Sequence, residues 1–183
     1  MDIKFRDATP EDVEIVAKTF LMAIEWDRPV TEELLGMCLR EDSLYSWRRT
    51  RIAEADGKSA GCLIAYPGEE YAVLRERTWS IFKSEATDSF DGFEPETYRG
   101  EFYLDSLAVL PEFRGHGIGR QLLLDGVRKG QALGYRRITL IAETDHPHLR
   151  QYYEETGFKP FAEMDFFGHR YTRMIFNNPN IIL

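Results

Sequence analysis

The sequence predicts an α/β fold of the α+β type, in which about four helices flank a mixed central sheet of about seven strands. Three observations support this prediction. Apolar residues recur at helical spacing after a helix-start signal at Thr9-Pro10. An Asp56-Gly57 turn between two apolar runs indicates a β-hairpin. A strand, a glycine-rich turn, a helix and a second strand follow one another over 102–142, an order typical of parallel strands joined by a right-handed crossover.

The N-terminal part of the chain should hold three strands and two helices. Thr9 is the expected N-cap of the first helix, and Thr31 opens the second. Apolar positions from Val13 to Ile24 keep the i, i+3, i+4 pattern of an amphipathic helix. The expected strands cover 3–6, 51–55 and 59–66, and the expected helices cover 10–24 and 31–40.

The C-terminal part begins with the strand 102–110 and the helix 117–133, which Gly134 should end in a left-handed cap. The next strand pairs with the first in parallel or splays away from it. A helix that Gly157 should end and a closing hairpin around Gly168-His169 complete the chain. These elements are expected over 137–142, 147–156, 161–167 and 170–176, and the whole chain, 1–183, is expected to form one domain.

Composition excludes several classes of protein. The net charge of −8 argues against a nucleic-acid binder, whose surface is basic. No run of about 18 apolar residues is present, so we expect no membrane span, and the N-terminus lacks the apolar core of a signal peptide. The two cysteines, Cys38 and Cys62, are too few for a disulfide scaffold. We therefore expect a cytoplasmic protein with two buried thiols.

The turn from Arg114 to Arg120 joins an apolar strand to an amphipathic helix and contains three glycines. Unpaired N–H groups at the start of a helix, together with the helix dipole, favour an anion such as phosphate. The two arginines add charge-assisted hydrogen bonds. No Gly-Lys-Ser/Thr follows, so the turn is not a P-loop, and the first glycine of the dinucleotide fingerprint is missing.

Arg114-Gly115-His116-Gly117-Ile118-Gly119, preceded by Leu107-Ala108-Val109 and Pro111, resembles the signature of the GNAT N-acetyltransferases. The predicted order of elements is similar to the GNAT fold from end to end. The resemblance implies a cofactor site for acetyl-CoA, used as a co-substrate, and transfer of its acetyl group to a primary amine. In that family this segment binds the pyrophosphate, which here implies contacts from Arg114, Gly115, His116, Gly117, Ile118, Gly119 and Arg120.

The resemblance extends to the catalytic groups. Leu107, Ala108 and Val109 would pair with the pantetheine arm, and the Val109 N–H would stabilise the oxyanion. Tyr153 aligns with the family's general acid within 146–158. Two residues depart from the family pattern: His146 stands where the family has an asparagine that touches pantetheine, and Leu149 stands where it has an alanine. A pantetheine contact from position 146 would therefore have to be made by a histidine.

A carboxylate is expected to take the proton of the amine, because an alkylammonium near pKa 10.4 holds its proton at pH 7. Strand alternation places four residues on one face: Glu101, Tyr103, Asp105 and Leu107. Asp105 lies in an otherwise apolar strand, where an unpaired carboxylate is costly, so it needs a partner or a wet cleft. The resemblance ranks Asp105 first and Glu101 second, because some GNAT members have an acid at this position or a few residues earlier. A salt-bridged structural acid is the alternative.

Residues 67–100 form a longer connection than the GNAT pattern usually has, with a helix expected near 74–82. This segment is either an insertion beside the acceptor cleft or a surface helix that packs aromatic residues on the sheet. His146 and His148 lack a third ligand at a recognisable spacing, so we expect no metal site.

Acidic residues around the aromatic segment 67–100 favour a small cationic metabolite or antibiotic over an acidic substrate as acceptor. Two other functions stay open: an acyl-CoA-binding regulatory module without turnover, and acetylation of protein N-termini or lysines. The free edge of the closing hairpin is compatible with a homodimer. We expect neither a nucleic acid nor a membrane among the partners.

Overall fold

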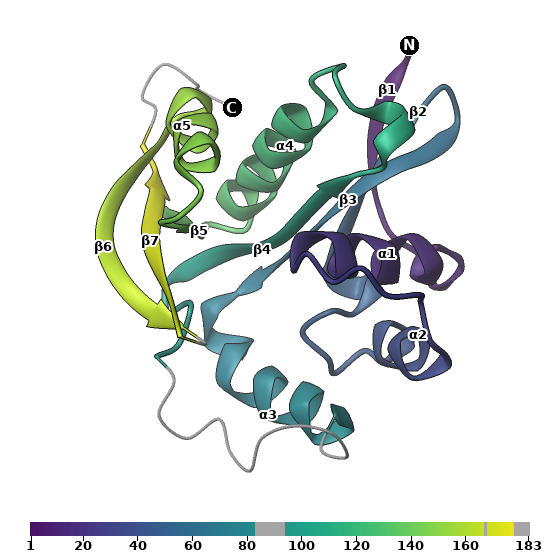
Figure 1. Cartoon of the computed structure of the whole chain (residues 1–183), viewed down its shortest axis with the longest axis horizontal. Coiled ribbons are helices and arrows are strands. Elements are labelled where there is room, and N and C mark those ends of the chain that lie inside the picture. Colours follow the sequence, from purple (N-terminus) through teal and green to yellow (C-terminus); the bar gives the residue numbers. More distant parts are fainter. Residues whose placement is uncertain (83–93, 167, 178–183) are drawn as a thin grey trace.

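The computed structural model describes residues 1–82, 94–166 and 168–177. Seven strands form one sheet in the order β1-β2-β3-β4-β5-β7-β6 (Figure 1). The pairs are antiparallel except β4 and β5, which run parallel. The strands are β1 (Ile3–Asp7), β2 (Thr50–Ala55), β3 (Lys58–Pro67), β4 (Glu101–Val109), β5 (Arg137–Glu143), β6 (Phe158–Phe166) and β7 (His169–Phe176).

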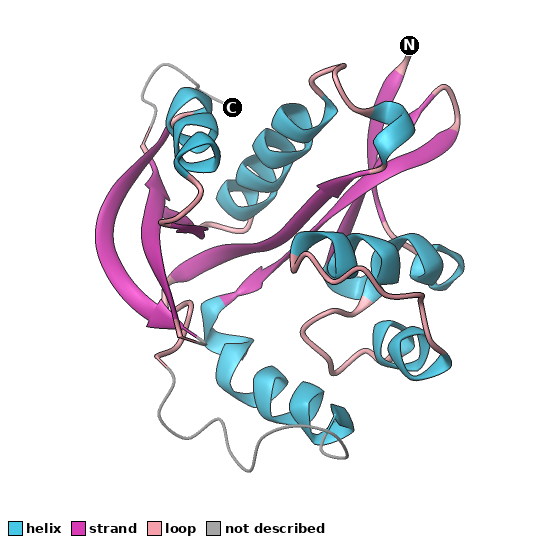
Figure 2. Ribbon diagram, viewed as in Figure 1, coloured by secondary structure: helices cyan, strands magenta, loops and turns pink. Residues whose placement is uncertain are grey.

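Helices cover both faces of the sheet (Figure 2). One face packs against α4 and α5, and the other packs against α1, α2 and α3. Each face has its own hydrophobic core, which we name the α4 core and the α1 core. The helices are α1 (Val13–Ala23), α2 (Glu32–Leu39), α3 (Tyr71–Phe82), α4 (Ile118–Ala132) and α5 (Pro147–Thr156).

The predicted fold class and order of elements are confirmed, with two differences. Among the described residues there are five α-helices, because α3, the helix expected near 74–82 in the 67–100 connection, stands beside the four flanking helices and begins earlier, at Tyr71. β6 begins at Phe158 and not at residue 161, because Gly157 ends α5 in a left-handed conformation and the buried Phe158 enters the sheet at once. Residues 83–93 of the connection and Phe167 of the hairpin lie outside the described residues.

β4 and β5 diverge soon after they meet. Their parallel pairing covers Glu101–Tyr103 against Arg137–Thr139, whereas β4 continues to Val109 beside β3. In the β3–β4 ladder the Leu110 N–H donates to the Ala60 carbonyl at 2.8 Å. Since backbone groups alternate along a strand, the N–H groups of Leu107 and Val109 point away from β3, to the side that β5 has left. β4 therefore presents backbone donors at the divergence.

A β-bulge interrupts β4 at Asp105. Ser106 pairs with Ile64 and Leu104 pairs with Ala65, so Asp105 is the extra residue. The predicted alternation is wrong beyond this point: Leu107 packs against the α4 core, as Leu104 does, and not on the face of Tyr103. The bulge reverses which residues face each core, and a pattern of apolar and polar letters does not reveal it.

Two glycines let α4 lie close to the sheet. A Cβ at Gly126 would lie 2.3 Å from Cδ2 of Leu63, and a Cβ at Gly130 would lie 2.5 Å from Cδ1 of Ile138. Both glycines are on the buried side of α4. This close approach fixes where the N-terminus of α4 stands relative to β4.

Candidate active site

The turn before α4 adopts the backbone conformation that its glycines predict. Gly115 and Gly117 have φ angles of 80° and 72°, which favour glycine. Gly117 is the N-cap of α4, and the first intrahelical hydrogen bond runs from Gln121 to its carbonyl. The N–H groups of the first turn are left for an outside acceptor, at the positive end of the helix dipole.

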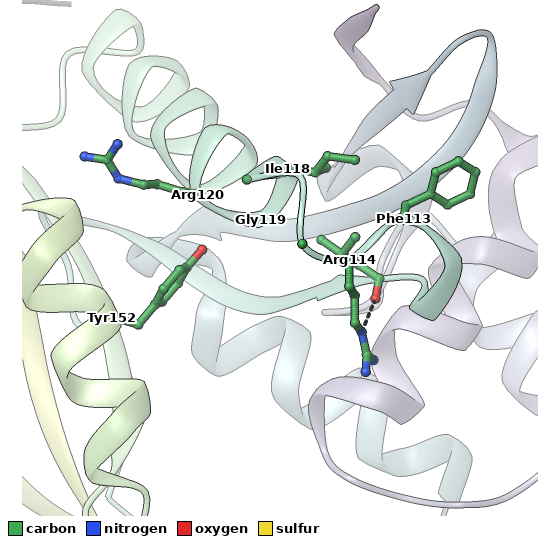
Figure 3. A pocket seen from close by; sticks show the side chains of 9 residues that line it. Phe113, Arg114, Ile118, Gly119, Arg120 and Tyr152 are labelled. Atoms are coloured by element: carbon green, nitrogen blue, oxygen red, sulfur yellow. Dashed lines mark hydrogen bonds between the residues drawn. The ribbon is translucent and has the colours of Figure 1, made fainter. Parts of the chain in front are cut away.

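A pocket of about 240 Å³ opens at this turn (Figure 3). The Arg114 Nε donates to the Val109 carbonyl at 3.0 Å, so the turn is tied to the end of β4. The ring of Tyr152 reaches the pocket from α5, and a Cβ at Gly119 would lie 3.1 Å from its hydroxyl. The lining consists of Val109, Phe113, Arg114, Gly115, Gly117, Ile118, Gly119, Arg120 and Tyr152.

The pocket brings together most of the residues predicted for the cofactor. His116 is exposed, with Nδ1 3.4 Å from the Phe113 carbonyl oxygen, and does not line the pocket. Leu107 and Val109 pack against the α4 core, and Ala108 pairs with Cys62 of β3. Tyr152 is a lining residue that sequence reasoning missed, although its position next to Tyr153 was the available signal.

Tyr153 is half-buried beside the α4 core. Its ring lies 5.5 Å from that of Tyr152 and 6.2 Å from that of Phe158, centroid to centroid. Burial raises the pKa of its phenol, with a smaller contribution from Tyr152. The phenol therefore keeps its proton at neutral pH and can donate it to an anion.

His146 is the N-cap residue of α5, and its Nδ1 lies 3.4 Å from Oε2 of Glu143. The other oxygen of Glu143 lies 2.6 Å from Nδ1 of His169. Within the described residues no group of three or more histidines, cysteines or acids could hold a metal ion. In the same part of the chain no helix combines the length and the apolar character needed to cross a membrane.

The side chain of Asp105 points into the face that carries the α1 core. Tyr66 donates its hydroxyl to Oδ2, and the Ser106 hydroxyl donates to Oδ1 at 2.6 Å. Burial raises the pKa of this carboxyl, and the two hydroxyl donors oppose the shift. Asp105 thus accepts hydrogen bonds from neutral hydroxyls, from no arginine among the described residues, and is half-buried.

Glu101 has a different environment, four residues earlier on β4. Its side chain is 4% exposed, and its oxygens accept from Arg173 at 2.6 Å and Arg137 at 3.2 Å. Oε2 also accepts from the Thr97 hydroxyl and the Tyr98 N–H. This geometry is that of a structural acid that holds the returning chain against the sheet.

Glu96 is a second carboxyl on the face of Asp105, and sequence reasoning missed it. Its two oxygens accept from the hydroxyls of Tyr71 and Tyr103, each at 3.0 Å. Burial, and then the charge of Asp105, raise its pKa to about 8. Its partners stand 25 and 7 residues away in sequence, so only the fold brings them together.

The family model for acetyltransferases of the GNAT family matches residues 14–158. The chain belongs to this family. The match includes the whole of β4, the glycine turn and α5, and therefore both groups of residues described above. Acetyl-CoA-dependent acetyl transfer is the activity of a GNAT acetyltransferase.

Solved structures agree with this assignment. A crystal structure of an acetyltransferase is 30% identical, with 94% of this chain aligned to 97% of the other and a TM-score of 0.76. An N-acetyltransferase from Staphylococcus aureus Mu50 is 21% identical over 94% and 99% of the two chains, with a TM-score of 0.78. The NatC complex bound to Gag peptide and CoA is 18% identical over 97% and 99%, with a TM-score of 0.58. The last two likenesses concern the fold alone, and among curated proteins no sequence matches significantly.

The glycine turn of this GNAT acetyltransferase fits the diphosphate of CoA. The backbone comes close to the pocket without a Cβ at Gly115, Gly117 or Gly119. Arg120 supplies positive charge from the pocket wall. The pocket lies on the α4 side of β4 and the two carboxyls lie on the α1 side, so one strand borders both.

Proposed function

We propose that this protein transfers the acetyl group of acetyl-CoA directly to a primary amine, with Asp105 on the acceptor side and Tyr153 on the side of the thiol. The observation that carries the proposal is the strand β4. It has the glycine pocket at its end, outward N–H groups at Leu107 and Val109, and a half-buried carboxyl at its bulge.

On the cofactor side, residues 114–120 hold the diphosphate, and residues 107–109 pair with the pantetheine arm. The Val109 N–H is aimed at the space between the diverging strands, where it would stabilise the oxyanion of the attacked carbonyl. His146 contacts Glu143 and lies on the opposite side of the divergence, at the N-terminus of α5. A pantetheine contact from His146 is therefore the least supported of the proposed contacts.

The proton balance of the reaction assigns a task to each catalytic residue. Asp105 takes one ammonium proton and releases it to solvent, and the freed electron pair of the nitrogen attacks the thioester carbon. The C–S bond breaks, and Tyr153 gives its proton to the leaving sulfur. A second of the three nitrogen protons then restores the phenol and the third stays on the amide, leaving amide, CoA thiol and one released proton. Glu101 is less suited to this work, because two arginines hold it.

The acceptor side favours a cation. Asp105 and Glu96 face it, and tyrosine hydroxyls surround them. We include in the proposal that a small cationic amine is the substrate, that the chain 1–183 is one cytoplasmic domain, and that 67–100 is an insertion beside the acceptor. Glu96 and α3 both belong to that segment.

Thermal unfolding with and without acetyl-CoA tests the cofactor, with ATP and NAD as controls. Ligand at about 100 times its Kd adds roughly 2.7 kcal/mol to stability, which is a rise of about 5–10 °C for a chain of this size. A rise with acetyl-CoA alone supports the proposal. A rise with a nucleotide and none with acetyl-CoA would assign the turn to another phosphate and remove the enzyme proposal.

Release of free thiol from acetyl-CoA then tests the acceptor. The panel contains an alkyl monoamine, a diamine, a triamine, an aminoglycoside and two peptides, one with a free N-terminus and one with an internal lysine. Turnover with a peptide alone would favour protein acetylation, the activity suggested by the likeness to NatC. Binding without turnover on the whole panel would favour a regulatory acyl-CoA-binding module.

A further inference from the structure

Two carboxyls on one face of the sheet, those of Asp105 and Glu96, accept hydrogen bonds from three tyrosine hydroxyls. The tyrosines come from β3, α3 and β4. Tyr66 donates to Asp105, whereas Tyr71 and Tyr103 donate to Glu96. The ring of Tyr66 lies close to both partners of Glu96, 5.8 Å from that of Tyr103 and 6.4 Å from that of Tyr71, centroid to centroid. The carboxyls are therefore held on one continuous aromatic support.

We propose that Glu96 and Asp105 form one proton-sharing pair, and that Glu96 is a catalytic residue that receives the ammonium proton together with Asp105. This inference rests on the proposed amine acetylation and adds a second carboxyl to its acceptor side. Tyr71 and Tyr103 are positioning residues, because they hold both oxygens of Glu96.

The anchoring of the segment that carries Glu96 supports this role. Glu101 accepts from the Thr97 hydroxyl and the Tyr98 N–H, directly after Glu96. Arg173 binds the same carboxylate at 2.6 Å, and its guanidinium lies 4.6 Å above the ring of Tyr98. Glu96 is thus held by its own hydrogen bonds and by the contacts of the next two residues, and it remains half-buried.

In the part of the chain that the structure describes, Glu96 and Asp105 form no ion pair like those of Glu101 with Arg137 and Arg173. Phenols dominate the surroundings, and the α3 residue Arg75 is the cation whose charge lowers the pKa of Glu96. A carboxyl pair in such surroundings keeps one proton to higher pH than a single carboxylate in water does. The titratable and charged groups facing Glu96 are Tyr103 and Asp105 of β4, Tyr66 of β3, Tyr71 and Arg75 of α3, Tyr45, and Tyr171 of β7.

The proton step is balanced as follows. With its pKa raised to about 8, the Glu96 carboxyl holds a proton below that pH and none above it. Above that pH an ammonium proton moves to a carboxylate oxygen and then to solvent, and the nitrogen keeps the electron pair for attack. An acceptor of pKa near 10.4 gives up its proton more readily to a base near 8 than to an ordinary carboxylate near 4.

Steady-state kinetics of Glu96→Gln tests the inference, using the panel amine that the wild-type protein acetylates fastest. Loss of a general base typically lowers the rate 10²–10⁴-fold, so we expect kcat at pH 9 to fall by about 100-fold with KM for acetyl-CoA unchanged. The acid limb of the kcat profile, near pH 8 in the wild type, should move to lower pH. Glu94→Gln is the matched control, since Glu94 is exposed two residues earlier and should keep both kcat and the limb.

A fluorinated form of the same amine, largely neutral at pH 7, should recover most of the rate in Glu96→Gln. A variant whose kcat stays within threefold of the wild type, with the same acid limb, would overturn the inference and leave amine acetylation intact. Absence of turnover by the wild-type protein on the whole panel would overturn both.

Glu96→Gln could also lose the tyrosine contacts on which local folding depends, so a second measurement uses the wild-type side chain. Carbon-13 NMR of the glutamate carboxyls should show Glu96 titrating near pH 8 in the wild type and at a lower pH in Asp105→Asn. A Glu96 titration near the ordinary value of about 4.3, unchanged by Asp105→Asn, would refute the shared proton.

Discussion

The glycine pocket and the carboxyl face lie on the two sides of β4, and the chain builds them differently. The pocket is made mostly from one continuous stretch, Val109 to Arg120, with a single ring added from α5. The carboxyl face joins Tyr66, Tyr71, Glu96, Tyr103 and Asp105 through contacts across as many as 39 residues. A local motif therefore defines the cofactor side, whereas the acceptor side depends on the register of the sheet. The predictions below test that difference, beginning with the largest effect.

Gly117→Asp should break the cofactor side alone. The new carboxylate would stand at the N-cap of α4, where the diphosphate is expected, and would repel it. We expect the Kd for acetyl-CoA, measured by calorimetry, to rise about 1,000-fold, which corresponds to about 4 kcal/mol. Gly57→Asp is the matched control, because Gly57 also has a positive φ, of 77°, and has open space around it. Equal losses in both variants would show general damage and not a diphosphate site.

Glu101→Gln and Asp105→Asn should separate a structural acid from a catalytic one on the same strand. Removing the charge of Glu101 leaves the buried Arg173 uncompensated, which typically costs about 3–5 kcal/mol. Asp105 has neutral hydroxyl donors, so its asparagine variant should unfold at nearly the wild-type urea concentration and lose kcat by about 100-fold or more. The reverse pattern, with stability lost at Asp105 and activity lost at Glu101, would exchange the two roles.

Tyr153→Phe should lower kcat by about 100-fold, about 2.7 kcal/mol, with little change in acetyl-CoA affinity. The phenol is removed, and the ring that contacts Phe158 is kept. Stopped-flow release of CoA thiol measures the effect. Tyr135→Phe, which removes an exposed hydroxyl that donates to Glu69, serves as the control and should leave the rate unchanged. A wild-type rate in Tyr153→Phe would move the general acid to another residue.

The stability of the protein should depend on pH through the carboxyl pair. Folding raises the pKa of both Glu96 and Asp105, so the folded state binds more protons than the unfolded state between the ordinary values and about pH 8. Their contribution to the free energy of unfolding is therefore fullest below about pH 4 and decreases as pH rises toward 8. In urea titrations from pH 5 to 9, Glu96→Gln should lose less stability than the wild type. A parallel loss in both proteins would contradict the raised pKa.

The parts of the fold that sequence predicted are those with local signals. Thr31 caps α2 by accepting from the Leu34 N–H, and Gly134 and Gly157 follow helices with positive φ, as their spacing indicates. The turn before α4 has positive φ angles at Gly115 and Gly117, as its run of glycines predicts. The thiols of Cys38 and Cys62 are buried, as composition suggested. In each case neighbouring residues decide the local structure.

The carboxyl face could not be predicted from the sequence, and the reason is physical. The extra residue in β4 leaves no trace in the pattern of apolar and polar residues. Regular alternation through Asp105 therefore predicts the wrong face of the sheet for Leu107. In the sequence, nothing distinguishes Glu96 from the other acids of its segment. Its contacts with Tyr71 and Tyr103 exist only in the folded chain. Glu101 shows the same limit, because Arg173 stands 72 residues away. Pairing at such separations is a property of the assembled sheet.

The bulge at Asp105 also affects how freely this acetyltransferase can change. Asp105 has no partner on β3, so replacing its side chain does not alter which residues of β4 pair with β3. Deleting the residue would join Leu104, opposite Ala65, directly to Ser106, opposite Ile64, so the ladder with β3 would continue without a bulge and Leu107 would stay on the side of α4. In protein engineering, the pairing of β4 therefore tolerates changes at position 105, and what such changes would remove is the carboxyl proposed to accept the proton.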